Sequence, residues 1–284
     1  MKDNKVVLVI GNVEDRVIQF FAKQLNGHAQ RTFCFIDQSL FGSQIHLTNK
    51  QWKLASGRVV DHHQVVGVWN RLVSLSSETD LLARTMEQYA CYLMDEVYPN
   101  VLNRPKHGMS NHSKQYQIDC ITTKKIKKVE SYICANNELD WGFQRQELIR
   151  KSLSGIRSIV CLMTPQEKKL RIEAPELFQP FIEGLNIRVH VISNKVIACC
   201  CESESVDYRY TDQVDMYRFD LPDWLEKECV NISQQLQIPF SGIDLIKKKQ
   251  SYYLLEVNPA PGYAYFDIDG SISRALHEYY MALI

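Results

Sequence analysis

The segment SGIDLIKKKQSYYLLEVNPAPG, residues 241–262, contains the pattern that decides the fold. Two apolar arms of strand type flank the lysines 247–249, which predicts a β-hairpin that turns on those lysines. The returning arm contains a glutamate and an asparagine two residues apart, and it ends at Asn-Pro-Ala-Pro-Gly. Because proline cannot continue a strand ladder, the hairpin should end at this point.

The polar residues of this hairpin form a candidate metal site. Side chains alternate along a strand, so Glu256 and Asn258 share one face, and a turn near Lys248 puts Asp244 roughly opposite them. Three hard oxygen ligands then converge, as Mg²⁺ requires. The alternative is an exposed hairpin whose acidic groups only increase solubility. A carboxylate inside the apolar run LLEV is costly unless it has a partner, which favours the metal site.

The composition excludes several classes of function. The 284 residues are 45% hydrophobic, enough to bury a core, and 33 basic residues balance 33 acidic ones. A net charge of zero gives no long-range field for nucleic acid or an anionic membrane, so we expect neither as a partner. The chain has no apolar stretch of the roughly 20 residues that a membrane helix needs. The nine cysteines form no CxxC pair, and we expect reduced thiols in a cytoplasmic protein.

The first part of the chain is predicted to form an α/β lobe over residues 1–105. Its strands are expected at residues 6–10, 32–37, 65–72 and 101–105, and its helices at 14–25 and 79–98, the latter ended by Pro99. Residues 42–61 receive no firm assignment.

Two further lobes are predicted. A central lobe, 106–183, contains a helix near residue 115, a strand at 129–137, a helix at 138–148, two strands within 148–163 that turn at Ser154-Gly155, and a strand at 176–182. The C-terminal lobe, 184–284, contains a hairpin that turns at Ser193-Asn194, a helix at 224–237, the hairpin described above and a terminal helix at 272–282.

Two lysines of the central lobe are candidate phosphate ligands. Lys151 ends a strand directly before Ser-Leu-Ser-Gly, and Lys114 begins a helix. A lysine at a strand end beside a turn of small residues suits nucleotide phosphates, although a surface role is the alternative for both. The chain contains neither GxxxxGK[ST] nor GxGxxG, which argues against a P-loop or Rossmann nucleotide site.

The segment QPFIEGLNIRVHV, residues 179–191, is a candidate nucleotide-binding connection between two strands. Its backbone could receive an adenine edge, and its polar residues could hold ribose hydroxyls. Arg188 points to the same side as His190 and would clamp an anion; the alternative is that Arg188 forms half of a buried ion pair. The candidate nucleotide contacts are Gln179, Phe181, Ile182, Glu183 and Asn186.

Six motifs occur in a definite order along the chain. They are VLNRP (101–105), SK (113–114), IRKSLSG (149–155), QPFIEGLNIRVHV (179–191), VDYR (206–209) and GIDLI…YYLLEVNPAPG (242–262). Together they resemble the ATP-grasp superfamily over residues 65–275. Within it, the chain is most similar to the RimK-like ligases: the ribosomal-protein glutamate ligase and the maturases that form lactone or lactam rings in ribosomal peptides.

The resemblance implies a fold of three lobes, with ATP held between two α+β lobes. It also implies one chemistry: a carboxylate attacks the γ-phosphate of ATP to give an acylphosphate and ADP, and an amine or a hydroxyl then displaces phosphate. Lys114 and Lys151 would contact the ATP phosphates, residues 179–183 the adenine, and Asn186 the ribose. The catalytic residues would be Arg188 and Arg209. Asp244, Glu256 and Asn258 would hold one or two Mg²⁺, with Mn²⁺ as a substitute.

Three departures from the family pattern affect these expectations. The loop after Lys151 has one glycine where many relatives have a glycine-rich lid, and Asn186 stands where a carboxylate is common. The first lobe gives no firm match outside VVGVWNRL, where Arg71 could face a substrate carboxylate or lie on the surface. The aromatics Tyr263, Tyr265 and Phe266 are expected to shape substrate choice.

The leading expectation is an ATP- and Mg²⁺-dependent ligase that joins a small-molecule or peptide carboxylate to an amine or a hydroxyl. A second is a macrocyclase of the same fold that recognises the leader of a precursor peptide. A third, of a different class, is a non-catalytic ATP-binding scaffold. Homo-oligomers are common among the relatives.

Overall fold

The computed structural model describes residues 5–73, 80–108, 114–134, 147–153, 160–163, 175–203 and 214–284. Contacts divide the chain into two compact units. Unit 1 comprises Met1–Gly108, Ile238–Phe240 and Gly262–Ile284, and unit 2 comprises Met109–Gln237 and Ser241–Pro261. The division into three lobes with boundaries at residues 105 and 183 stays a prediction.

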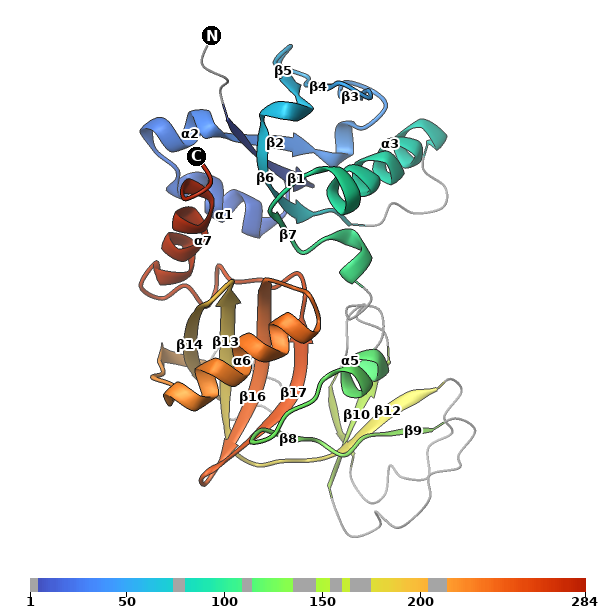
Figure 1. The fold of residues 1–284 in the computed structure, drawn as a ribbon. Coiled ribbons are helices and arrows are strands. Elements are labelled where there is room, and N and C mark those ends of the chain that lie inside the picture. Colours follow the sequence, from blue (N-terminus) through green and yellow to red (C-terminus); the bar gives the residue numbers. More distant parts are fainter. Residues whose placement is uncertain are drawn as a thin grey trace. The chain divides into compact units, whose positions relative to one another are not determined.

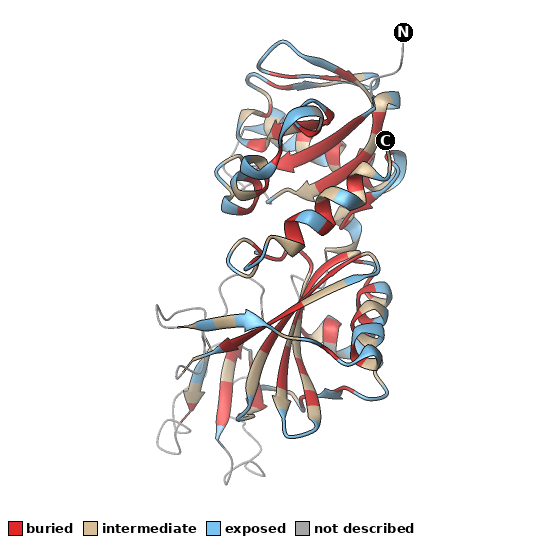
Figure 2. Cartoon of the chain, turned by 90° about the vertical axis from the view of Figure 1, so that its left-hand side faces the viewer, coloured by how far each residue is buried: buried red, intermediate tan, exposed pale blue. Residues whose placement is uncertain are grey.

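Unit 1 is built on a parallel sheet with strand order β2-β1-β6-β7 (Figure 1). Its strands are β1 (Val6–Gly11), β2 (Phe33–Asp37), β6 (Val65–Arg71) and β7 (Val101–Leu102). Every residue of β1 is buried, as expected for a central parallel strand covered on both faces (Figure 2). The strands predicted for the first lobe are therefore confirmed.

The helices of unit 1 are α1 (Arg16–Gln24), α2 (Gly27–Thr32), α3 (Leu81–Tyr92) and α7 (Ser271–Met281). Asp15 caps α1 by accepting a hydrogen bond of 2.8 Å from the Val17 N–H, and Asp80 caps α3 in the same way. The predicted helix over 79–98 is present as α3 followed by a π-helical turn, Leu93–Val97. Pro99 follows the C-cap residue of this segment, Tyr98, as expected for a helix stop.

The terminal helix α7 packs against the sheet at Gly67 of β6. A Cβ atom at Gly67 would lie 2.9 Å from Leu283 Cδ1 and 3.2 Å from Tyr280 Cδ1, so only glycine allows this close approach. Tyr280 is fully buried, and its ring meets Phe33 edge to face at 5.7 Å between centroids. The last helix therefore belongs to the compact unit that begins at the N-terminus.

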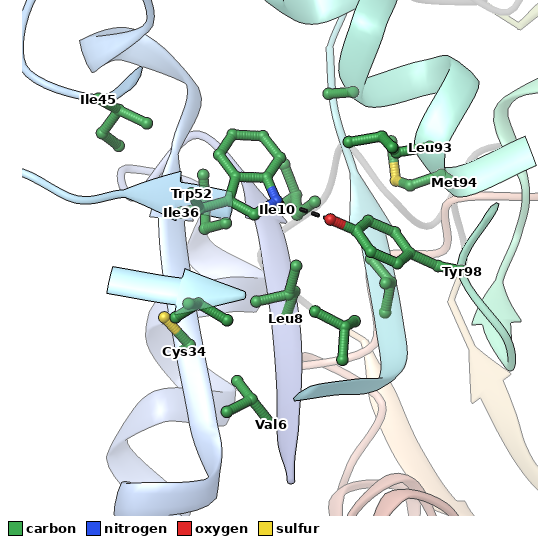
Figure 3. Packing of buried hydrophobic residues seen from close by; sticks show 14 of the residues in the cluster. Val6, Leu8, Ile10, Cys34, Ile36, Ile45, Trp52, Leu93, Met94 and Tyr98 are labelled. Carbon is green, nitrogen blue, oxygen red and sulfur yellow. Dashed lines mark hydrogen bonds between the residues drawn. The ribbon is translucent and has the colours of Figure 1, made fainter. Parts of the chain in front are cut away.

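Residues 42–61, which the sequence leaves unassigned, form a small antiparallel sheet with order β3-β4-β5. Its strands are β3 (His46–Leu47), β4 (Gln51–Lys53) and β5 (Val59–Asp61). Trp52 of β4 is fully buried in the core of unit 1 (Figure 3).

A chain of three side chains ties this small sheet to the rest of unit 1. Trp52 Nε1 donates to the hydroxyl oxygen of Tyr98 at 2.9 Å, as Figure 3 shows. His62 Nδ1 lies 2.5 Å from the same oxygen, and His62 Nε2 lies 2.8 Å from the Thr48 carbonyl oxygen. Because a carbonyl only accepts, His62 donates through Nε2, and the Tyr98 hydroxyl donates to Nδ1. His62 thus has a structural role, because it links Tyr98 to the backbone at Thr48.

Removing the Tyr98 hydroxyl should destabilise unit 1. Tyr98→Phe leaves the buried Trp52 N–H without its acceptor, which we expect to lower the free energy of unfolding by about 1–3 kcal/mol. Urea denaturation followed by circular dichroism measures this. Tyr92→Phe is the matched control because Tyr92 is 52% exposed. Equal denaturation midpoints for the two variants would contradict the assigned role of the hydroxyl.

One expectation for the segment after the hairpin is wrong. The sequence suggests that Tyr263 shapes substrate choice, but this residue is fully buried in unit 1. Its ring centroid lies 6.0 Å from that of Phe240 and 6.2 Å from that of Trp69. The side chain of Tyr263 is therefore part of the hydrophobic core. Sequence alone does not distinguish a buried aromatic residue from an exposed one. Tyr265, in contrast, is 58% exposed.

Unit 2 contains a four-stranded antiparallel sheet with order β11-β10-β12-β9. Its strands are β9 (Tyr132–Cys134), β10 (Leu148–Ser152), β11 (Cys161–Met163) and β12 (Glu176–Pro180). The helix predicted at 138–148 and the turn at Ser154-Gly155 fall largely outside the described residues, but the two strands around that turn pair as expected.

The second sheet of unit 2 has the order β15-β14-β13-β16-β17-β8. Its strands are β8 (Lys127–Lys128), β13 (Leu185–Ile192), β14 (Lys195–Glu202), β15 (Asp215–Arg218), β16 (Phe240–Lys248) and β17 (Ser251–Asn258). Helix α6 (Asp223–Gln235) packs on one face, and α5 (Lys114–Cys120) contacts β17 (Figure 1). Both predicted hairpins are present, with Ser193 and Lys249 at positive φ in the turns.

The cysteines behave as the sequence predicts. Cys199, Cys200 and Cys201 of β14 are all buried, and all nine cysteines are free thiols. No helix among the described residues has the length and apolar character needed to cross a membrane.

Candidate functional site

A hollow lies in unit 2 between its two sheets. Strands β10 and β12 of one sheet and β13, β16 and β17 of the other contribute to its walls, together with the connection from β12 to β13. The predicted site residues among its lining are Lys151, Gln179, Phe181, Ile182, Asn186, Asp244 and Glu256. A smaller hollow beside it is lined by Lys114, Lys151 and Glu256 among others.

The hairpin of β16 and β17 brings the two predicted acidic ligands together. Asp244 is the direct cross-strand partner of Glu256, and Gly242 is the partner of Asn258. The pairing shifts by one residue after Asp244, because Leu255 forms a bulge on β17. Glu256 and Asn258 follow the bulge two residues apart, so their side chains lie on the same face of the strand. The predicted opposition of the carboxylates is confirmed, whereas their binding of metal stays a prediction.

Arg188 forms the ion pair that the sequence leaves as an alternative. Its Nη1 lies 2.7 Å from Asp244 Oδ2, and the side chains are 5% and 14% exposed. The guanidinium occupies the space where Gly242 lacks a side chain: a Cβ there would overlap Nη2 and lie 2.6 Å from Cζ. Glycine at 242 therefore lets a buried arginine reach the carboxylate.

The lysines are not surface residues, so that alternative is wrong for both. Lys114 and Lys151 are 9% and 7% exposed. Lys114 Nζ donates to the Ser152 carbonyl at 3.1 Å and lies 3.9 Å from Glu256 Oε2. Burying an ammonium group is costly without compensation, and for Lys114 the Ser152 carbonyl oxygen and the Glu256 carboxylate supply it.

The end of β12 and the connection from β12 to β13 contain the predicted adenine contacts. Gln179 is buried and donates through Nε2 to Ser131 Oγ at 2.8 Å. The Phe181 N–H donates to the Glu147 carbonyl at 2.8 Å, so this N–H already has a protein acceptor. Glu183 is exposed and is not among the residues that line the hollow. Its predicted ribose contact therefore has less support than that of Asn186, which does line the hollow.

Besides Glu183, the predicted residues Arg188 and Asn258 are not among the residues that line either hollow. Asn258 is half-buried on the same face as Glu256. Arg209 lies outside the described residues.

The structure adds two residues that the sequence does not indicate. The first is Gln117 of α5, which is buried and bonds both backbone groups of Val257: it accepts from the N–H at 2.9 Å and donates to the carbonyl at 2.5 Å. β8 pairs with β17 only at Tyr253 and Leu254. Gln117 therefore satisfies the backbone hydrogen-bonding groups of β17 past that pairing, at Val257 between Glu256 and Asn258. The second is Gly242. An isolated glutamine or glycine in a sequence carries no signal of such contacts.

The charge of Arg188 also affects a neighbouring strand. Cys199 is its cross-strand partner on β14. A hydrogen bond with Cys201, and to a lesser degree the positive charge of Arg188, lower the pKa of the Cys199 thiol against the opposing effect of burial.

The fold agrees with what known proteins show. A family model described as an ATP-grasp domain matches residues 120–262, half of the chain. The chain therefore belongs to the ATP-grasp family, and the predicted fold class is confirmed.

Two solved structures have the same fold over nearly the whole chain. The macrocyclase MdnC bound with the precursor peptide MdnA, from Microcystis aeruginosa, is 17% identical with a TM-score of 0.75, covering 96% of this chain and 98% of that one. The ATP-grasp ligase PsnB, complexed with a phosphomimetic variant of a minimal precursor, Mg and ADP, is 19% identical with a TM-score of 0.76, covering 97% and 99%.

A curated relative matches over a shorter length. A protein of Histophilus somni described as a probable alpha-L-glutamate ligase is 27% identical over a match of 150 residues, and the match covers 45% of this chain and 48% of that protein. The chain spans about half the length of the curated relatives it matches.

Proposed function

We propose that this protein is an ATP- and Mg²⁺-dependent ligase that activates a carboxylate as an acylphosphate and transfers the acyl group to an amine or a hydroxyl. The observation that carries the proposal is one arrangement in unit 2. Two facing carboxylates, Asp244 and Glu256, share the walls of the two hollows with the buried cations Lys114 and Lys151, and buried Arg188 pairs with Asp244.

The residues present fit a nucleotide and its metal. Asp244 and Glu256 face each other across a strand pair and are 14% and 16% exposed, so they offer oxygen ligands at a partly open position. With Asn258 they would hold one or two Mg²⁺, for which Mn²⁺ is a chemically suitable substitute. Bound Mg²⁺ would neutralise charge on the phosphate oxygens. The neighbour PsnB was solved with Mg and ADP, which supports this choice.

The protein residues would position and neutralise the transferring group. Lys114 and Lys151 would hold phosphates, while residues 179–183 and Asn186 would hold adenine and ribose. Arg188 would stabilise the charge that develops on the γ-phosphoryl group, and Arg209 would join it. Because phosphoryl transfer is catalysed mainly by positioning and charge stabilisation, this set needs no nucleophilic side chain.

The chemical steps balance as follows. A carboxylate oxygen forms a bond to the γ-phosphorus, and the bond from that phosphorus to the bridging oxygen breaks, releasing ADP. The amine or hydroxyl then attacks the acyl carbon, the bond from the acyl carbon to the phosphate oxygen breaks, and inorganic phosphate leaves. The nucleophile loses its proton to solvent.

Hydroxylamine tests the acylphosphate directly. We would incubate the protein with Mg-ATP and pooled carboxylates, follow ADP release, and measure acyl hydroxamate formed by hydroxylamine. The proposal predicts ADP and hydroxamate in equal amounts, both dependent on a carboxylate and on Mg²⁺. ADP release that is independent of every carboxylate would contradict the acylphosphate.

A second candidate is a macrocyclase that acts on a precursor peptide. It is favoured by the similarity of fold: MdnC, solved with a precursor peptide, has a TM-score of 0.75, against 0.61 for a RimK domain protein of Sphaerobacter thermophilus that covers the same 96% of this chain. Loss of one water per ring from an acidic peptide, seen by mass spectrometry, would support it. Addition of a free amino acid would support the glutamate-ligase type instead.

A non-catalytic scaffold would bind Mg-ATP tightly and release no ADP with any acceptor. The burial of two lysines and an arginine around the carboxylates argues for turnover. A cytoplasmic location is also proposed, because all nine cysteines are free thiols.

A further inference from the structure

Helix α5 contacts strand β17 at two successive residues, and the proposed chemistry uses only the first contact. Lys114 Nζ lies 3.9 Å from Glu256 Oε2. One turn later on the same helix, the carboxamide of Gln117 accepts from the Val257 N–H at 2.9 Å and donates to the Val257 carbonyl at 2.5 Å. Residues three apart lie on the same face of a helix, so both buried side chains reach β17 together.

The carboxamide of Gln117 takes the place of a neighbouring strand along the outer side of β17. On its inner side, β17 pairs with β16 from Ser251 to Asn258. On its outer side, it pairs with the short strand β8 at Tyr253 and Leu254. A carboxamide both donates and accepts, as a peptide group does, so Gln117 supplies at Val257 the bonds that a longer strand would make.

Val257 lies between the two candidate metal ligands of β17, Glu256 and Asn258. The bulge at Leu255 comes directly before these residues, and a bulge disrupts the regular hydrogen bonding and bends the strand. Holding the backbone at Val257 fixes the direction in which the side chains on either side of it leave the strand. Without the two bonds from Gln117, this segment would be less restrained, and the geometry of the two ligands would vary.

The helix that carries Gln117 is itself held at both ends. At its start, Lys114 Nζ donates to the Ser152 carbonyl of β10 at 3.1 Å. Just after its end, Gln235 of α6 bonds both backbone groups of Thr122, accepting from the N–H at 2.7 Å and donating to the carbonyl at 2.9 Å. A residue that orients another must stand on a rigid element, and α5 meets this condition.

We propose that Gln117 is a positioning residue of the ligase: it holds the backbone of β17 at Val257, between the two candidate metal ligands, and so keeps both in the geometry that Mg²⁺ binding needs. The inference rests on the proposed function and adds to it a residue that acts through the metal ligands. Because Gln117 and Lys114 stand on one helix, the placement of the metal ligands and of a phosphate ligand then depend on each other.

Gln117→Met tests this role, because it keeps a long unbranched side chain and removes both bonds to Val257. Two readouts do not depend on turnover. Hydrogen exchange of the protein without nucleotide should become faster at the Val257 N–H. Titration of Mn²⁺ in the presence of ADP, followed by the electron paramagnetic resonance of free Mn²⁺, should give a dissociation constant raised about tenfold or more, as is typical when a group that orients metal ligands is removed. The Mg²⁺ concentration for half-maximal ADP release should rise by a similar factor.

Gln38→Met is the matched control for a loss of stability alone. The carboxamide of Gln38 in unit 1 is also buried and bonds both backbone groups of Val73, accepting from its N–H at 3.0 Å. Its loss should lower the melting temperature as Gln117→Met does and should leave Mn²⁺ binding unchanged. Gln117→Asn has a side chain one methylene shorter and is a milder second variant, with an expected dissociation constant between those of the wild type and Gln117→Met.

A double variant shows whether Gln117 acts through the metal ligands. In a Glu256→Gln background, where one ligand is already changed, Gln117→Met should weaken Mn²⁺ binding little further, because residues that act through one another are not additive. Full additivity of the two substitutions would contradict the assigned role.

The remaining outcomes also decide the inference. It is overturned by equal Mn²⁺ dissociation constants for the wild type and folded Gln117→Met or Gln117→Asn, by an equal loss in Gln38→Met, and by a wild type that binds no Mn²⁺ with ADP. If the wild type releases no ADP with any acceptor, but its Mn²⁺ binding is weakened by Gln117→Met and not by Gln38→Met, the proposed ligase function fails while the assignment of Gln117 stands.

Discussion

Glu256→Gln is expected to lower the rate of ADP release at least about a hundredfold, since it removes one of the carboxylates proposed to bind Mg²⁺ at the proposed phosphoryl-transfer site. The substitution keeps the shape of the side chain and changes only its charge and donor pattern. Glu256 is the cross-strand partner of Asp244, so the glutamine also lowers the negative charge that would hold Mg²⁺. The measurement is steady-state ADP release over a range of Mg²⁺ concentrations, together with the melting temperature.

The matched control is Glu226→Gln, because Glu226 is an exposed glutamate on α6 of the same unit. It should leave both turnover and melting temperature unchanged. Asn258→Ala should reduce turnover in the same direction as Glu256→Gln. The metal assignment would be wrong if either site variant kept near-wild-type turnover while folding normally.

The hairpin that contains Glu256 and Asn258 can be predicted from the sequence because its two strands are adjacent in the chain. Alternation in the arms and a short turn predict the hairpin and bring Asp244 roughly opposite Glu256. A regular register continued from the pair Leu245–Leu254 would place Asp244 opposite Leu255, and the bulge shifts it to Glu256. The bulge at Leu255 is not predictable in this way, since it adds one residue to one strand without a sequence signal of its own.

Contacts between distant segments carry no such local signal. The burial of Lys114 and Lys151 depends on how α5 and β10 pack, and an isolated lysine is surface-exposed in most proteins. Gln117 contacts Val257 across 140 residues of sequence. The sheet around Trp52 receives no assignment from the sequence for a different reason: its strands are only two or three residues long, too short to show a period.

Arg188 shows how two interpretations of one residue can both hold. The sequence offers an anion clamp or half of a buried ion pair, and the structure shows the ion pair with Asp244. Since a guanidinium has five donors, the same group can keep Asp244 oriented and still present donors to a phosphate. The ion pair is therefore compatible with the proposed role and makes that role dependent on the space around Gly242.

Gly242→Ala tests this dependence. The new methyl group would overlap Arg188 Nη2 and would lie 2.6 Å from Cζ and 2.8 Å from Pro261 Cβ, so the guanidinium must move. A misplacement of about 1 Å in a catalytic group can cost about a hundredfold in rate, and we expect a loss of that size in ADP release. Overpacking should lower the free energy of unfolding by about 1–3 kcal/mol, which denaturant titration measures separately.

Two comparisons show whether the loss acts through Arg188. Gly262→Ala is the matched control, because no described atom would lie within 4 Å of its Cβ, and it should leave turnover unchanged. In an Arg188→Ala background, where the obstructed side chain is absent, Gly242→Ala should add little further loss, since residues in direct contact are not additive. If the two substitutions instead multiplied their effects, Gly242 would act independently of Arg188, and the ion pair could not be the reason for glycine at this position.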